Sequence, residues 1–201
     1  MSAAHWNNPQ EAQQYGVSLL SSDRIRLRPT TEQDLVCIEK WWSDPAWEPL
    51  QQLIVRPRPV ARTVEMFRTW SQNSGNDLGA GFSVITLDSD EMIGHVVLHG
   101  RFQPARIATF AIVLSPDHVG KGLGTEATRL MVRYGFQELG LHKIELQVWS
   151  YNTRAIRSYE KAGFVIEGER RAAAFHAGTF HGETQMGILL EEYQQLSPGS
   201  S

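Results

Sequence analysis

The chain has 201 residues, 41% of them hydrophobic and 20% charged, which is enough apolar material for one ordinary core. A net charge of -3 gives no electrostatic reason to expect nucleic acid or an anionic membrane as a partner. Because Cys37 is the single cysteine, an intramolecular disulfide and a thiolate metal cluster are excluded. The start lacks a signal-peptide core and no apolar run approaches the roughly 20 residues that span a bilayer, so we expect a soluble, cytoplasmic protein.

Both ends of the chain are polar. Residues 1–22 are rich in Asn, Gln and Ser without a clear period, and residues 194–201 end in small polar side chains. Such segments bury little apolar surface, so we expect both to be flexible. The folded domain is therefore expected to span residues 23–193.

The first elements are a strand and two helices. Residues 24–28 alternate charged and apolar side chains, which indicates a half-buried strand. A helix follows, capped by Thr30 or Thr31 and ending near Pro45, because the residue before proline avoids the helical region. A second helical pattern covers residues 60–71.

A period of two then predicts a hairpin with strands at 82–87 and 92–99. Residues 107–114 are almost all apolar, as expected for a central strand covered on both faces. After a turn, residues 123–140 show a helical stripe that closes at a glycine, and 144–149 alternate as a further strand.

A last helix begins at Asn152 and ends at Gly163, and a closing hairpin folds about residues 177–178 between 164 and 190. Together these elements predict an α/β fold. We expect a mixed, twisted sheet of about seven strands flanked by about four main helices.

Three glycines, Gly120, Gly122 and Gly124, interrupt the segment between the apolar strand and the next helix. Glycines let a backbone approach an anion closely, and a helix N-terminus adds a partial positive charge of about half a unit. The Lys121 side chain adds a full positive charge. This pattern indicates phosphate binding, although a purely structural turn is an alternative interpretation of the same residues.

The spacing G-x-G-x-G differs from the dinucleotide and P-loop patterns, which are G-x-G-x-x-G and G-x-x-x-x-G-K-[ST]. Glu145 does follow the turn by about 20 residues, where a ribose-binding acid is expected in a dinucleotide fold. A nucleotide-dependent oxidoreductase is therefore a distant alternative.

A second motif, Asn-x-x-Ala-x-x-x-Tyr-x-Lys-x-Gly-Phe, runs from Asn152 to Phe164. Asn152 and Tyr159 lie seven residues apart, so both can face one groove. With the glycine turn in front of it, this helix resembles the GNAT superfamily of acyl-CoA N-acyltransferases. The resemblance covers about residues 25–190, and its details are similar to the branch that acetylates ribosomal-protein N-termini, polyamines and amino-bearing antibiotics.

The resemblance implies that the strands at 107–114 and 144–149 splay to form an acyl-CoA cleft, in which backbone groups near Val113 and Leu114 bind the pantetheine arm. It also implies that Asn152 holds this arm and that a main-chain amide beside Leu114 supports the oxyanion. Tyr159 would protonate the departing thiolate, since a phenol stays protonated at neutral pH. The implied cofactor-binding residues are Val113, Leu114, Val119, Gly120, Lys121, Gly122, Gly124, Thr125 and Asn152; no metal is expected.

The sequence departs from the family pattern at two positions. Val119 stands where the turn motif usually has Gln or Arg, and we expect only a modest effect because that residue acts through its backbone amide. The same branch often has an acidic residue at the position of Thr109, so a general base on that strand is in doubt.

The general base is therefore left open between several side chains and a water path. Three tryptophans, Trp41 and Trp42 in the first helix and Trp47 after it, either wall the acceptor pocket or belong to the core. Cys37 is expected to be a buried structural thiol. The candidate bases are His95, His99, His118, His181, Glu48 and Glu183, and His95 and His99 share parity on one strand.

The resemblance implies direct acetyl transfer from acetyl-CoA to a primary amine, without an acyl-enzyme. The acceptor is an antibiotic, an amino sugar, a polyamine or a peptide N-terminus. The alternative is a catalytically silent module that senses acyl-CoA. Homodimers are common in similar proteins.

Overall fold

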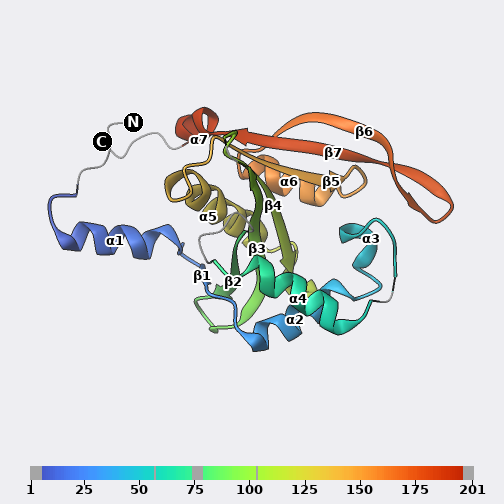
Figure 1. Cartoon of the computed structure of the whole chain (residues 1–201), viewed down its shortest axis with the longest axis horizontal. Helices are drawn as coiled ribbons and strands as arrows, with labels where there is room; N and C mark the ends of the chain where they lie inside the picture. Colours follow the sequence, from blue (N-terminus) through green and yellow to red (C-terminus); the bar gives the residue numbers. More distant parts are fainter. Residues whose placement is uncertain (1–5, 57, 74–78, 103, 197–201) are drawn as a thin grey trace.

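The structure is a computed structural model that describes residues 6–56, 58–73, 79–102 and 104–196. Its centre is one seven-stranded sheet with the order β1-β2-β3-β4-β5-β7-β6 (Figure 1). Neighbouring strands run antiparallel except β4 and β5, which are parallel. The strands are β1 Ile25–Arg28, β2 Ala80–Thr86, β3 Met92–Phe102, β4 Ile107–Leu114, β5 Lys143–Trp149, β6 Val165–His176 and β7 Thr179–Leu189. The predicted mixed sheet of seven strands is confirmed.

The four predicted helices are also present, and the described residues hold three more, α1, α3 and α7. A short 3-10 helix, Pro116–His118, joins β4 to the glycine turn. No helix in the described part of the chain is both long and apolar enough to cross a membrane. The α-helices are α1 Pro9–Leu19, α2 Glu32–Trp42, α3 Glu48–Gln51, α4 Val60–Trp70, α5 Leu123–Gln137, α6 Thr153–Lys161 and α7 Leu190–Leu196.

Residues 9–19 of the N-terminal segment, which we expected to be flexible, form helix α1. The Asn8 side chain caps this helix by accepting a hydrogen bond from the Glu11 amide at 3.0 Å. Only Leu19 is buried along α1, and the helix therefore shows no apolar stripe in the sequence. Arg133 of α5 ties its end to the domain by donating to the Leu19 carbonyl at 2.8 Å.

Residues 194–196 of the expected flexible tail belong to α7, whereas 197–201 lie outside the described residues. The expectation for the one cysteine is wrong. Cys37 is exposed and not a buried thiol. The buried face of α2 comprises Asp34, Leu35 and Ile38, and Cys37 lies on the other side of the helix with Val36, which is 66% exposed.

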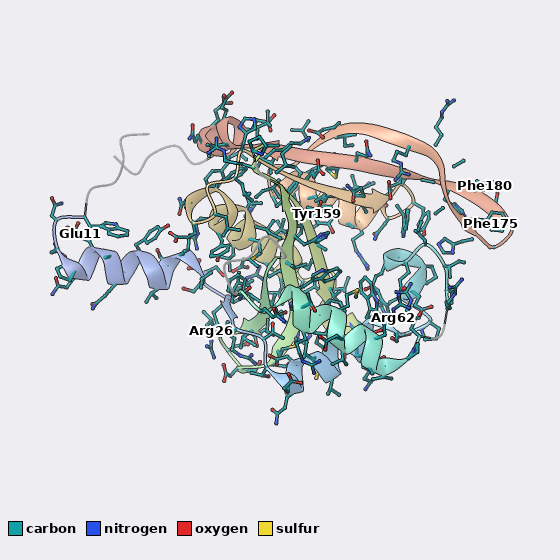
Figure 2. The ribbon with its side chains drawn as sticks, viewed as in Figure 1. Glu11, Arg26, Arg62, Tyr159, Phe175 and Phe180 are labelled. Atoms are coloured by element: carbon teal, nitrogen blue, oxygen red, sulfur yellow. The ribbon has the colours of Figure 1, made fainter. Side chains whose placement is uncertain are left out.

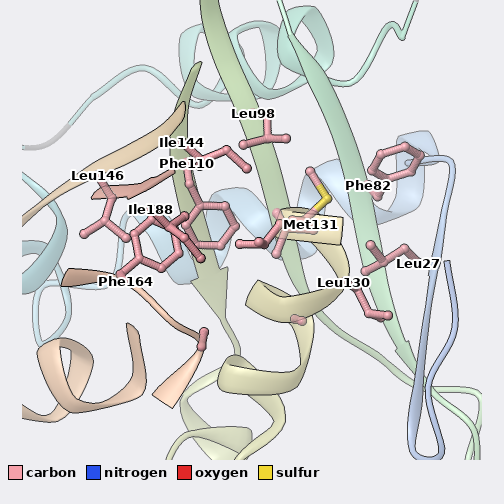
Figure 3. Close-up of a cluster of buried hydrophobic side chains, with 14 of the residues drawn as sticks. Leu27, Phe82, Leu98, Phe110, Leu130, Met131, Ile144, Leu146, Phe164 and Ile188 are labelled. Atoms are coloured by element: carbon pink, nitrogen blue, oxygen red, sulfur yellow. The ribbon is translucent and has the colours of Figure 1, made fainter. Parts of the chain in front are cut away.

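Two hydrophobic cores cover the two faces of the sheet. The larger core lies between the sheet and the helices α5 and α6, where Met131 packs among strand residues such as Phe110 and Ile144 (Figure 3). The smaller core joins Ile38 of α2 and Phe67 of α4 to Val113 of β4. Because side chains alternate along a strand, β4 contributes to both cores and is central, as predicted.

Strands β4 and β5 separate after a short ladder. Their pairing comprises Ile107 with Lys143, Ala108 with Ile144, and Thr109 with Glu145. Beyond these pairs, β4 continues to Leu114 and β5 to Trp149, with no further register between them in the described residues. This divergence confirms the expected splay and opens a cleft between the two strands.

Helix α2 is anchored to the sheet by a buried carboxylate. Thr31 and Asp34 form a capping box, and Asp34 also accepts hydrogen bonds from Arg28 at 2.5 Å and from Ser83 at 2.9 Å. Burial favours the neutral form of Asp34, but the hydrogen bonds from Arg28, Thr31 and Ser83 outweigh it and lower the pKa of this carboxyl. The position of α2 against β1 and β2 therefore depends on one ionised side chain.

Candidate active site

A cavity of about 750 Å³ lies at the splay of β4 and β5. Its walls come from the end of β4, the glycine turn, α5 and α6 on one side, and from the α2–α3 region and β7 on the other. In Figure 1, α5 and α3 lie on opposite sides of β3 and β4. The cavity therefore has two walls, which we name by their residues. The donor wall consists of the lining residues that lie within 110–128 and 147–161, and the acceptor wall of Trp42, Trp47, Leu50, Gln51, Gln52, Leu53, Arg58 and Glu183.

The glycine turn needs glycine for two different reasons. Gly120 and Gly122 have φ values of 84° and 83°, in the left-handed region that side chains rarely adopt. Gly122 is the N-cap of α5, so the turn leads directly into a helix N-terminus. At Gly124, a Cβ would lie 2.8 Å from Leu114 Cδ1, and the missing side chain lets the helix approach β4.

The structure brings nearly all the predicted cofactor-binding residues to this cavity. Thr125 also links α5 to α6, because its Oγ1 lies 2.7 Å from Ser158 Oγ. The Lys121 side chain is exposed and is not among the lining residues, so the geometry does not aim its ammonium into the cavity. The predicted residues that line the cavity are Val113, Leu114, Val119, Gly120, Gly122, Gly124, Thr125 and Asn152.

Asn152 begins helix α6, as predicted. Its side-chain oxygen accepts a hydrogen bond from the Ala155 amide at 3.2 Å and so serves as the helix cap. The remaining NH₂ of the side chain is the group left to bind a ligand, and Asn152 lines the cavity.

Tyr159, labelled in Figure 2, lies two turns further along α6. It also lines the cavity. Its ring packs edge-on against Phe110, with centroids 6.2 Å apart, and tilted against Phe164 at 6.1 Å. Burial raises the pKa of Tyr159 to about 12, because the charged phenolate is poorly solvated there. The phenol therefore remains protonated, and able to donate a proton, throughout the neutral range.

The two histidines on β3 do not reach the cavity. His95 is 1% exposed, and its Nε2 lies 2.8 Å from Ser71 Oγ, while burial lowers its pKa to about 4. His99 stacks on Trp70 with centroids 5.2 Å apart. Their shared parity does place them on one face, but that face is covered by α4.

Of the other candidate bases, only Glu183 lines the cavity. It lies on β7 opposite Trp149 and accepts a hydrogen bond from Arg170 at 2.6 Å. Glu48 is buried, but its carboxylate accepts from the Arg56 amide at 3.0 Å outside the lining. His118 and His181 also lie outside the lining residues.

Several residues that line the cavity were not predicted from the sequence. Arg154 and Arg157 are three residues apart on α6, a spacing that places them on one side of the helix, and the Arg154 guanidinium lies 5.5 Å from the Trp47 ring centroid. Of the three tryptophans weighed as pocket walls, Trp42 and Trp47 line the cavity, while Trp41 and Trp42 pack against the smaller core. The spacing of Arg154 and Arg157 could have indicated that both line the cavity. No pattern in the sequence indicates that Arg58 does so.

Comparison with known proteins identifies the class. The model of the acetyltransferase (GNAT) domain matches residues 24–165, which is more than half of the chain. The chain therefore belongs to the GNAT acetyltransferase family.

Two curated relatives show how far the similarity extends. A spermidine N(1)-acetyltransferase of Escherichia coli K12 is 39% identical over 98 residues, which are 48% of this chain and 53% of the relative. The chain thus spans about half the length of this relative. An uncharacterized N-acetyltransferase of Bacillus licheniformis is 28% identical over 175 residues, covering 87% of this chain and 97% of the relative.

Solved structures give the same fold. The spermidine N-acetyltransferase of Vibrio cholerae, solved in complex with CoA and spermine, superposes with a TM-score of 0.76. It is 26% identical, and the match covers 86% of this chain and 99% of that one.

Proposed function

We propose that the protein is an N-acetyltransferase that moves an acetyl group from acetyl-CoA directly to a primary amine. The observation that carries this proposal is that the glycine turn, the end of β4 and the protonated Tyr159 all line one cavity at the splay. Each of these features supplies a different requirement of acyl transfer: anion binding, orientation of the donor and a proton.

The donor wall fits the chemistry of CoA. The left-handed conformations at Gly120 and Gly122 precede the N-terminus of α5, a combination suited to a pyrophosphate. Three cations from α6, Arg154, Arg157 and Lys161, line the same wall and can pair with phosphate groups. Past Thr109, the unpaired side of β4 offers backbone groups near Val113 and Leu114 to an extended arm.

Acetyl-CoA supplies a thioester, whose C–S bond breaks as the new amide C–N bond forms. In this proposal Tyr159 gives its proton to the departing thiolate, and the turn and Asn152 hold the donor in place. The acceptor nitrogen must lose a proton, since an ammonium, with a pKa near 10, has no lone pair for attack. Glu183, or water reached through it, is the group that we propose accepts this proton. The second proton that the nitrogen loses as the amide forms restores the Tyr159 phenol.

The acceptor wall carries little negative charge. Among the described lining residues, Glu183 is the one carboxylate, and it is already paired with Arg170, while Arg58 adds a positive charge. A polyamine, which carries several positive charges, gains less from such a wall than a singly charged amine does. The charges therefore favour a monoamine or a peptide N-terminus, whereas the relatives named as spermidine acetyltransferases favour a polyamine.

Release of free CoA from acetyl-CoA tests the proposal, measured with a thiol reagent across polyamines, aminoglycosides, amino acids and short peptides. Turnover with one class establishes the activity and identifies the acceptor class. Tight acetyl-CoA binding by calorimetry without turnover across a broad panel supports the alternative, a module that senses acyl-CoA. Absence of acetyl-CoA binding contradicts both.

A further inference from the structure

The outer side of the glycine turn is in contact with an arginine that belongs to neither family motif. Arg24 directly precedes β1, and its Nη1 donates a hydrogen bond to the Lys121 carbonyl oxygen at 3.2 Å. At the next residue, a Cβ built on Gly122 would lie 3.4 Å from Arg24 Nη2. The guanidinium is therefore hydrogen-bonded to the turn at Lys121 and lies beside it at Gly122.

This guanidinium is itself held in a fixed orientation. The Glu126 carboxylate accepts hydrogen bonds from Arg24 Nε at 2.8 Å and from Arg24 Nη2 at 2.5 Å. The same carboxylate accepts from Ser22 Oγ at 2.5 Å and from the Arg24 amide at 3.3 Å. Both guanidinium donors meet the same carboxylate oxygen, Glu126 Oε2, and a two-pronged donor of this kind fixes the direction of the guanidinium as well as its distance.

Because the peptide bond is planar, the hydrogen bond to the Lys121 carbonyl also sets the direction of the Gly122 N–H. A trans peptide unit is planar, so the carbonyl of Lys121 and the N–H of Gly122 point in opposite directions. Arg24 holds the carbonyl toward the outside, and the N–H of Gly122 must then point away from Arg24. Gly122 lines both the cavity and a second pocket, and Arg24 lines only the second one. An N–H that points away from Arg24 is therefore directed toward the cavity.

We propose that Arg24 is a positioning residue that aims the Gly122 amide at the pyrophosphate of the acyl donor. The inference rests on the proposed function, because it assigns the glycine turn to that pyrophosphate. Glycine gives the turn its conformation but also leaves it free to adopt others. Arg24 selects one orientation of the Lys121–Gly122 peptide before the donor arrives, which lowers the cost of binding.

Arg24 has a second effect, which is electrostatic. Glu126 lies in the first turn of α5, where a bound phosphate would meet its negative charge. Its side chain is 18% exposed, so solvent screens this charge incompletely. The ion pair with Arg24 neutralises the carboxylate and removes this repulsion.

The test compares two acyl donors, acetyl-CoA and S-acetylpantetheine, which has the thioester and the pantetheine arm but no pyrophosphate. In R24M we expect the Kd for CoA, measured by calorimetry, to rise about tenfold, which corresponds to about 1.4 kcal/mol. At saturating acetyl-CoA, kcat should stay near the wild-type value. With S-acetylpantetheine, kcat/KM should be unchanged, because this donor never uses the Gly122 amide.

Two further variants separate the two effects of Arg24. R24K keeps the positive charge but loses the two-pronged geometry, so we expect an intermediate Kd. Adding E126Q to R24M removes the unpaired carboxylate and should recover part of the lost affinity. The matched control is R26M: Arg26 lies two residues away on β1 and pairs with the exposed Asp90 (Figure 2). Its Kd for CoA should equal that of the wild type.

Other outcomes overturn the inference. An unchanged Kd in R24M, or equal losses with acetyl-CoA and S-acetylpantetheine, would show that Arg24 has no role specific to the phosphates. If the wild-type protein itself bound no CoA, the proposed function would fail instead, so the two failures are distinguishable. Should R24M be unfolded at the assay temperature, the same comparison is made with R24K.

Discussion

The two walls of the cavity differ in how the chain builds them. The donor wall comes from one contiguous stretch, in which β4, the glycine turn, α5, β5 and α6 follow one another between residues 107 and 161. The acceptor wall joins Trp42 to Glu183, which are far apart in the sequence. A wall built from one contiguous stretch has a sequence motif with fixed spacing. A wall that tertiary packing assembles from distant segments has no such motif. The donor is therefore far easier to infer than the acceptor.

The largest effect is expected at the donor wall from Gly122→Val. Valine is strongly disfavoured at a φ of 83°, and its side chain would also displace the turn from its present conformation. We expect acetyl-CoA binding to be lost in calorimetry. Gly140→Val is the matched control, because Gly140 also has a positive φ, 60°, but lies outside the cavity lining. If Gly122→Val bound acetyl-CoA normally, the turn would not be the phosphate site.

The second largest effect is expected from Tyr159→Phe, which removes the proposed acid and keeps the ring packing. We expect kcat to fall about 100-fold with little change in the Kd for acetyl-CoA. Since the pKa of Tyr159 is about 12, wild-type kcat should show no alkaline decline from this group below about pH 11. Tyr151→Phe, which removes a hydroxyl that donates to the Pro49 carbonyl outside the cavity lining, serves as the control. Equal losses of kcat and of acetyl-CoA affinity in Tyr159→Phe would indicate a structural role.

A smaller effect, confined to the acceptor wall, is expected from Glu183→Gln. We expect kcat/KM for the amine to fall about tenfold, with the Kd for acetyl-CoA unchanged, because the cavity loses its lining carboxylate. Glu48→Gln is the isosteric control, since Glu48 is buried but outside the lining. The reverse ranking of these two variants in steady-state kinetics would reassign the acceptor site to Glu48.

The smallest effect on activity is expected from Asp34→Asn, which weakens the attachment of α2. We expect the free energy of unfolding in urea to fall by about 2 kcal/mol at pH 7, the order of a hydrogen bond to a charged group. Because the folded-state pKa of Asp34 is lowered, its stabilisation is present above the unfolded pKa of 3.8 and is lost as pH falls through the folded value. The difference between wild type and variant should therefore shrink below about pH 4.

The same variant tests whether the two walls are independent. Since α2 carries Trp42, KM for the amine should rise modestly in Asp34→Asn, while the Kd for acetyl-CoA should not. A loss of acetyl-CoA affinity as large as the loss of amine affinity would show that the walls are coupled.

The sequence was sufficient for the sheet and for most of the donor wall. Alternation and capping residues located the seven strands and four helices, and two motifs located residues such as Gly122 and Asn152. The sequence was insufficient where the role of a residue depended on whether another element covers its face of the sheet. The parity of His95 and His99 was predicted correctly, but only the packing of α4 shows that this face is closed. Helix α1 was missed because it buries one residue and has no apolar period.

The splay of β4 and β5 also bears on how the fold opens. The ladder of three residue pairs is the main-chain connection between two half-sheets, β1 to β4 and β5 to β7. In a continuous sheet the central strands hold the most slowly exchanging amides. Here the described residues 110–114 have no strand partner on the β5 side, and a bound donor would replace water as the partner of their amides there. The centre of this sheet is therefore a place where amide exchange reports occupancy of the cleft and not only global unfolding.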